Sequence, residues 1–104
     1  MIKTIRKILG LGPKVDLKTL IAQGAVIVDV RSKGEFAGGH VKGSVNIPLD
    51  QLENNLGKLK SKGQPIITCC ASGMRSASAK SLLQRHGYLH VYNGRSWHAV
   101  QKHV

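Results

Sequence analysis

Acidic residues are scarce in this sequence. Its 104 residues include 5 Asp or Glu against 16 Lys or Arg, which gives a formal charge of +11 at pH 7. A field of that sign raises the local concentration of small anions and of acidic partners. Aromatic residues make up 4% of the chain, and the basic residues are scattered from Lys3 to Lys102. Without stacking side chains or a dense basic tract, we expect no nucleic-acid partner.

Cysteines and long apolar runs are also few. Cys69 and Cys70 are neighbours, so they cannot cross-link distant parts of the chain, and a reducing, cytoplasmic location is expected. The apolar runs are far shorter than the roughly 20 residues that cross a bilayer, so we expect no stable membrane insertion. The histidines, at positions 40, 86, 90, 98 and 103, lack the clustered spacing of a metal site. We therefore predict no metal.

The length of the chain fits one domain with a single core. We expect residues 14–104 to form it, after a basic segment over residues 1–13 whose isoleucines have helical spacing. That segment lacks the unbroken apolar stretch and the small-residue cleavage site of a signal peptide. Packing on the domain or fraying is its expected state, and a short membrane-surface helix is the alternative.

Strands and helices alternate along the rest of the sequence. Apolar, β-branched runs predict strands over 25–30, 44–47, 66–69 and 90–92. Caps and helical spacing predict helices after Asp16, after Asp50 with its capping-box partner Glu53, over 77–86, and after residues 93–97. The alternation predicts an α/β fold, with a central, mostly parallel sheet of four to five strands flanked by helices on both faces. Ligands then bind at the carboxyl ends of the strands.

The strand over 66–69 leads into a loop that carries a candidate nucleophile, Cys70. The rest of the loop is Ala71, Ser72, Gly73, Met74, Arg75 and Ser76. Successive backbone N–H groups in such a loop form an anion-binding nest, and the dipole of the following helix adds positive charge. Gly73 permits a positive φ, and Arg75 adds a forked cation at the base of the nest. These features favour the thiolate, which is the nucleophilic form of cysteine.

Cys-x-x-Gly-x-Arg-Ser at residues 70–76 resembles the active-site loop of the rhodanese (sulfurtransferase) family. Upstream, residues 28–32, Glu35-Phe36 and residues 39–49 resemble further motifs of the same family, in the same order. By this resemblance Asp29, Arg31 and Glu35 join polar interactions that brace the loops near the site, and His40 is a scaffold residue. The family's closing motif, similar to residues 93–97, is imperfect here, because Arg95 replaces its second glycine. We expect Arg95 to add a cation near the mouth of the site.

The resemblance covers roughly residues 15–100 and implies a single-domain thiosulfate sulfurtransferase without a cofactor. The implied reaction is a double displacement. The Cys70 thiolate takes the sulfane sulfur of a donor such as thiosulfate as a persulfide, and then passes it to cyanide or to a thiol. A small anionic donor and these acceptors are the expected partners, and an acidic sulfur-relay protein is a further candidate.

Two other functions stay open. Counting from Cys69 gives Cys-x5-Arg-Ser, the spacing of cysteine phosphatase loops, although Thr68 stands where those enzymes usually carry His. The second is a rhodanese-like module that binds partners or senses redox state with little turnover. Strand geometry favours Cys70 over Cys69 as the reactive thiol. Cys69 should still belong to the strand, where burial raises the pKa of a thiol, and Cys70 should begin the turn.

Overall fold

The computed structural model describes residues 16–59 and 61–104, so the basic segment predicted over residues 1–13 lies outside the described residues. Its strands are β1 (Val26–Asp29), β2 (Val45–Asn46), β3 (Ile66–Cys70) and β4 (Val91–Ser96). They form one sheet in the order β2-β1-β3-β4, and every neighbouring pair is parallel. The helices are α2 (Leu17–Ala22), α3 (Lys33–Ala37), α4 (Leu49–Leu52), the 3-10 helix η1 (Glu53–Lys58), α5 (Met74–Arg85) and α6 (Trp97–Gln101). The predicted α/β fold is confirmed.

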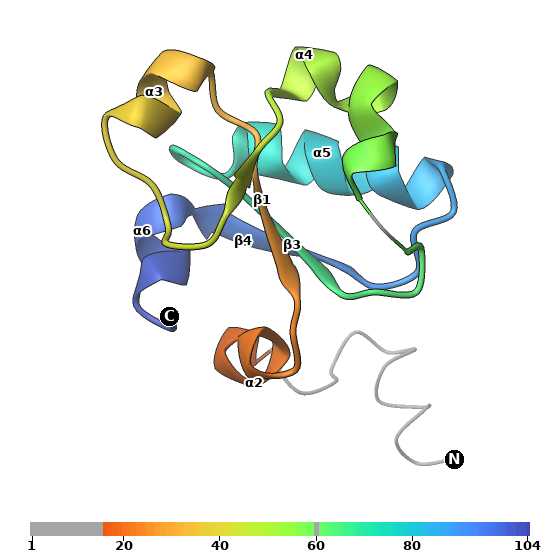
Figure 1. The fold of residues 1–104 in the computed structure, drawn as a ribbon, viewed down its shortest axis with the longest axis horizontal. Helices are drawn as coiled ribbons and strands as arrows, with labels where there is room; N and C mark the ends of the chain where they lie inside the picture. Colours follow the sequence, from red (N-terminus) through yellow and green to blue (C-terminus); the bar gives the residue numbers. More distant parts are fainter. Residues whose placement is uncertain (1–15, 60) are drawn as a thin grey trace.

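Helices cover both faces of the sheet (Figure 1). The long helix α5 and the α4–η1 segment lie on one face, and α2 and α6 lie on the other. Successive residues of β3 alternate between the two faces, as the pleat of a strand requires. Cys70 packs in the same core as Leu83 of α5, whereas Ile67 and Cys69 pack in the same core as Val100 of α6. None of the described helices is both long and apolar enough to cross a membrane.

The capping box predicted at Asp50 and Glu53 is wrong. Pro48 precedes α4, and no side chain makes a capping hydrogen bond to that helix. The capping box is instead at Ser32 and Glu35, where it starts α3, a helix that is not among the predicted elements. Ser-x-x-Glu is the signal that could have revealed α3. The helix is too short for its apolar residues to show a helical period.

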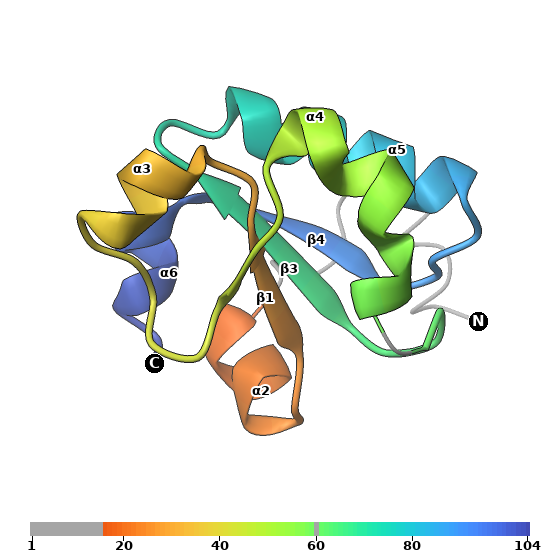
Figure 2. The ribbon, with the colours of Figure 1, turned by 45° about the horizontal axis from the view of Figure 1, so that its top comes forward.

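The strand and the helix on either side of the Cys70 loop both extend further than predicted. Cys70, expected to begin the turn, is the last residue of β3, and α5 begins at Met74 rather than at residue 77. Gly73 makes this short connection possible, because its φ of 112° lies in the left-handed region that favours glycine. Figure 2 shows β3 running into this loop, with α3 and α6 at the same end of the sheet.

Gly94 of β4 lies where no side chain fits. A Cβ at this position would lie 2.6 Å from Val100 Cγ2, 2.8 Å from Ile67 Cγ2 and 2.8 Å from the carbonyl oxygen of Thr68. We expect Gly94→Ala to lower the free energy of unfolding by about 3 kcal/mol, because overpacking forces the backbone of β3 or α6 to move. Urea denaturation measures this loss. Gly34→Ala is the control, since a Cβ there meets nothing within 4 Å; a similar loss in both variants would contradict the steric explanation.

Candidate active site

The sulfur of Cys70 lies beneath the loop that follows β3. It accepts hydrogen bonds from the backbone N–H groups of Gly73, at 2.9 Å, and of Ser76, at 3.3 Å. Two N–H donors directed at one sulfur stabilise negative charge on it. Cys70 is 1% exposed. The exposed residues of the loop are Ala71, Ser72 and Met74.

Cys69 faces the opposite side of the sheet. Its side chain is fully buried in the core that contains Ile67 and Val100. Burial, followed by the nearby charge of Asp29, raises the pKa of the Cys69 thiol to about 12. At neutral pH this group is therefore a protonated thiol. Of the two cysteines, Cys70 is the one whose sulfur faces the loop.

Arg75, in the first turn of α5, forms a two-pronged ion pair with Glu35. Its Nη1 donates to Oε1 at 2.8 Å and its Nη2 donates to Oε2 at 3.0 Å. The same carboxylate accepts a hydrogen bond from the backbone N–H of Ser32 at 3.0 Å. The pair ties α5 to α3. Arg75, expected at the base of the nest, thus has both ends of its guanidinium occupied by Glu35.

This ion pair should make stability depend on pH. The hydrogen bonds from Arg75, followed by that from Ser32, lower the pKa of Glu35 from 4.5 to about 2. A carboxyl group whose pKa is depressed in the folded state stabilises the protein above its unfolded pKa, and this contribution is lost as the pH falls through the folded pKa. We therefore expect Glu35→Gln to lower the melting temperature at pH 7 and to have little effect at pH 2. Equal decreases at both pH values in thermal denaturation would show that the charge is irrelevant.

A buried ion pair braces the segment that leads from β1 into α3. Asp29 accepts hydrogen bonds from the backbone N–H of Arg31, at 3.0 Å, and from its Nη2, at 2.8 Å. The same Nη2 donates to the carbonyl oxygen of Gly39 at 2.7 Å, and Nη1 donates to that of Glu35 at 3.3 Å. The guanidinium also lies over the ring of Trp97, 4.9 Å from its centroid. Arg31 therefore joins β1, the α3 segment and α6.

His40 lies at the exposed end of this braced segment. Its Nδ1 is 2.8 Å from the carbonyl oxygen of Phe36, and the two rings stack with their centroids 3.7 Å apart. His40 thus supports the turn after α3. In the part of the chain that the structure describes, no three His, Cys, Asp or Glu side chains are grouped so that they could hold a metal ion.

Sequence spacing does not reveal the polar cluster behind the loop, which is formed by the buried Thr68 and Ser76 and the half-buried Asn93. The hydroxyl oxygens of Thr68 and Ser76 are 2.7 Å apart, and Ser76 Oγ donates to Asn93 Oδ1 at 2.6 Å. Ser76 is fully buried, so its hydroxyl serves this cluster while its backbone N–H serves the Cys70 sulfur. The cluster holds that N–H in place. Its members come from β3, α5 and β4, and no local pattern links them.

A pocket of about 380 Å³ opens beside the loop, at the carboxyl ends of β1 and β2. Its lining residues are Val30, Ser32, Pro48, Leu49, Asp50 and Arg75. They come from the starts of α3, α4 and α5 and from the chain that enters them. This is the edge of a parallel sheet at which ligands bind. The pocket and the Cys70 loop share this edge.

Known proteins share this fold. A family model described as "Rhodanese-like domain" matches residues 14–99. The uncharacterized protein YqhL of Bacillus subtilis (strain 168) is 36% identical over 69 residues, which are 66% of this chain and 54% of YqhL, so the chain spans about half of that relative's length. Thiosulfate sulfurtransferase PspE of Escherichia coli (strain K12) is 33% identical over 67 residues, 64% of either chain. A solved structure of a rhodanese with anions from E. coli superposes with a TM-score of 0.68 at 30% identity, covering 73% of this chain and 91% of that one.

The region matched by the family model contains the four strands that the structure describes, the Cys70 loop and both residues of the Glu35–Arg75 ion pair. The solved structures agree with it in the arrangement of the sheet and helices. Sequence and fold thus lead to the same assignment over most of the chain, and the protein belongs to the rhodanese family.

Proposed function

We propose that this protein is a sulfurtransferase that moves sulfane sulfur from a donor such as thiosulfate to a thiophilic acceptor, through a persulfide on Cys70. The observation that carries the proposal is the convergence of the Gly73 and Ser76 N–H groups on the Cys70 sulfur, at 2.9 and 3.3 Å. These donors stabilise the negative charge that the site carries as a thiolate and as a persulfide. The relative PspE, named a thiosulfate sulfurtransferase, supports the reaction class.

The first half-reaction adds one sulfur atom to Cys70. The thiolate attacks the sulfane sulfur of thiosulfate and forms a new S–S bond, while the bond between the two sulfur atoms of the donor breaks. Sulfite leaves with the electron pair of that bond, and Cys70 becomes a persulfide anion. In the second half-reaction, cyanide or a thiolate attacks the outer sulfur and Cys70 leaves as the thiolate. Neither step needs an outside oxidant or a cofactor.

The loop has separate parts for binding and for support. We assign donor binding to the backbone N–H groups of residues 71–76. Because Cys70 is 1% exposed, the exposed residues of this loop must shift to admit the donor. While these exposed residues shift, the Glu35–Arg75 ion pair and the buried Ser76 hold the far end of the loop in place. The loop can then open at Ala71 and Ser72 without losing the N–H groups of Gly73 and Ser76.

Mass spectrometry of the intact protein tests the proposal. Incubation with thiosulfate should increase the mass by that of one sulfur atom. Cyanide should then remove this sulfur and release thiocyanate in an equal amount. An unchanged mass would reject the proposal, and an added sulfur that neither cyanide nor a thiol removes would favour a sensing module over a transferase.

A further inference from the structure

Arg95 has an unusual backbone conformation for its residue type. Among the described residues it is the one non-glycine with a positive φ, at 69°. The left-handed region favours glycine because a Cβ is crowded there. Strain of this kind persists where the surroundings hold it in place, and it often marks a functional position.

Asn93 and Gly73 place Arg95 beside the Cys70 loop. Its backbone N–H donates to Asn93 Oδ1 at 2.8 Å, the same oxygen that accepts the hydroxyl of Ser76. On its other side, Arg95 Cα and Cβ each lie 3.5 Å from the position that a Cβ of Gly73 would occupy. Arg95 therefore lies beside Gly73, the residue that makes the shorter hydrogen bond to Cys70.

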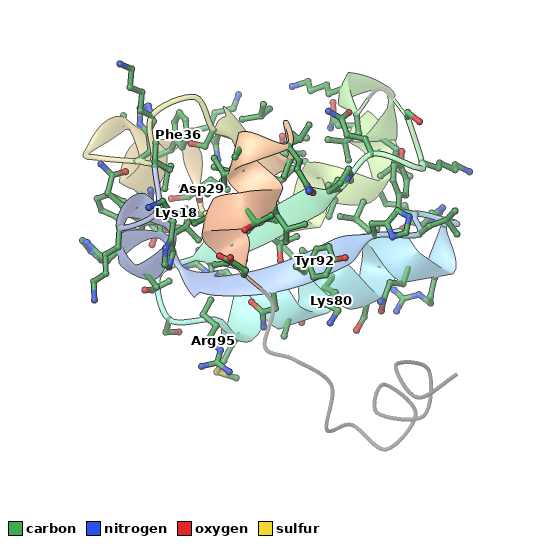
Figure 3. The ribbon with its side chains drawn as sticks, turned by 90° about the horizontal axis from the view of Figure 1, so that it is seen from below. Lys18, Asp29, Phe36, Lys80, Tyr92 and Arg95 are labelled. Atoms are coloured by element: carbon green, nitrogen blue, oxygen red, sulfur yellow. The ribbon has the colours of Figure 1, made fainter. Side chains whose placement is uncertain are left out.

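The charge of Arg95 is also free to act on a ligand. Arg31 and Arg75 are paired with Asp29 and Glu35, whereas Arg95 belongs to no ion pair among the residues that the structure describes. Its side chain is exposed. Figure 3 shows it projecting from β4 beside the start of α5, clear of the rest of the sheet. The loop thus has an unneutralised cation at its rim.

We infer that Arg95 is a specificity-determining residue that favours sulfur donors with two negative charges, such as thiosulfate, over donors with one, such as methanethiosulfonate. The inference rests on the proposed function. Coulomb attraction is proportional to the charge of the donor, and it acts over about 10 Å at 0.1 M salt. The restrained backbone keeps the cation at the rim of the loop, so the donor meets it on approach.

Steady-state kinetics with the two donors provide the first test. Asn tolerates a left-handed backbone, so Arg95→Asn removes the charge without adding strain. We expect it to lower kcat/KM roughly fivefold for thiosulfate and roughly twofold for methanethiosulfonate, since the attraction is halved with the charge. Arg95→Lys should keep most of the preference. Arg85→Asn, an equal loss of charge at the far end of α5, should leave the preference unchanged. Equal falls for both donors, or no fall, would overturn the inference.

Alkylation of Cys70 provides a second test that does not depend on sulfur transfer. Iodoacetate and iodoacetamide react with a thiolate in the same way, but the first is an anion and the second is neutral. Arg95→Asn should lower the rate with iodoacetate, relative to the rate with iodoacetamide, roughly twofold. Arg85→Asn should leave this ratio of rates unchanged. If the ratio and the donor preference are both unchanged in a protein that accepts sulfur, the role of Arg95 is rejected. If the ratio changes but neither donor transfers sulfur, the proposed function is rejected.

Discussion

Cys70→Ala should abolish the uptake of sulfur from thiosulfate, whereas Cys69→Ala should retain most of it. Each variant removes one thiol group, and the two positions are adjacent in the same strand. Cys70 accepts hydrogen bonds from two N–H groups of the loop, and Cys69 is buried on the other face with a pKa of about 12. A nucleophile must be a thiolate that can reach its substrate. Of the two cysteines, only Cys70 lies beneath the loop with backbone N–H groups directed at its sulfur.

The measurement is the mass of each variant after incubation with thiosulfate, followed by peptide mapping of the wild type. Both cysteines are buried, so thermal denaturation should first show that each variant is folded at the assay temperature. Iodoacetamide provides a second comparison, because it should label the wild type and Cys69→Ala at Cys70 and leave folded Cys70→Ala unlabelled. If the added sulfur were found on Cys69, the assignment of Cys70 as the nucleophile would be wrong. The alternative in which Cys69 is the reactive cysteine, at the spacing of phosphatase loops, would then be favoured.

Asp29→Asn should cost about 3–5 kcal/mol of folding free energy, the usual effect of removing one partner of a buried ion pair. Asp29 is fully buried, and its partner Arg31 has a side chain that is 5% exposed. Asparagine offers one oxygen where the carboxylate offers two, and its NH2 group opposes the donors of Arg31. The positive charge of Arg31 would then be buried without a counterion.

Urea denaturation measures the cost, and two variants control for its cause. Asp50→Asn removes a carboxylate from an exposed position and should change stability by less than about 0.5 kcal/mol. Arg31→Gln combined with Asp29→Asn removes the uncompensated charge and should recover part of the loss. A loss below about 1 kcal/mol for Asp29→Asn, typical of exposed pairs, would mean that Arg31 reaches solvent in the variant.

The strands of this protein were predictable because their signal is local. Residues 25–30 and 66–69 are nearly continuous in apolar residues, as buried parallel strands usually are, and β1 and β3 lie within a residue of these bounds. The extension of β3 to Cys70 was not predictable, because Cys70 pairs with Ser96 across a register shift that depends on β4. A local pattern cannot report a pairing with a strand that follows much later in the chain.

In the candidate site, too, local sequence patterns do not reveal which side chains from distant parts of the chain are paired. The resemblance named Asp29, Arg31 and Glu35 as a bracing group, and the motif named Arg75, but no spacing links Glu35 to Arg75, which is 40 residues away. The chemistry of a guanidinium indicates that it needs an acceptor, without indicating which one. Residue type and motif thus predicted candidate residues at the loop, and the fold decides which of them are paired, as Arg75 is with Glu35, and which, like Arg95, belong to no ion pair among the described residues.

The positions of Cys69 and Cys70 on opposite faces of β3 affect how long a bound sulfur atom would survive. In many redox sites a second thiol attacks the first and discharges it as a disulfide. Here the nearest thiol along the chain is separated from Cys70 by the sheet itself and packs in the other core. In the proposed reaction, Cys69 therefore offers the persulfide no internal route of decay. The lifetime of the stored sulfur is then set by the supply of an acceptor from outside, which is the property expected of a carrier.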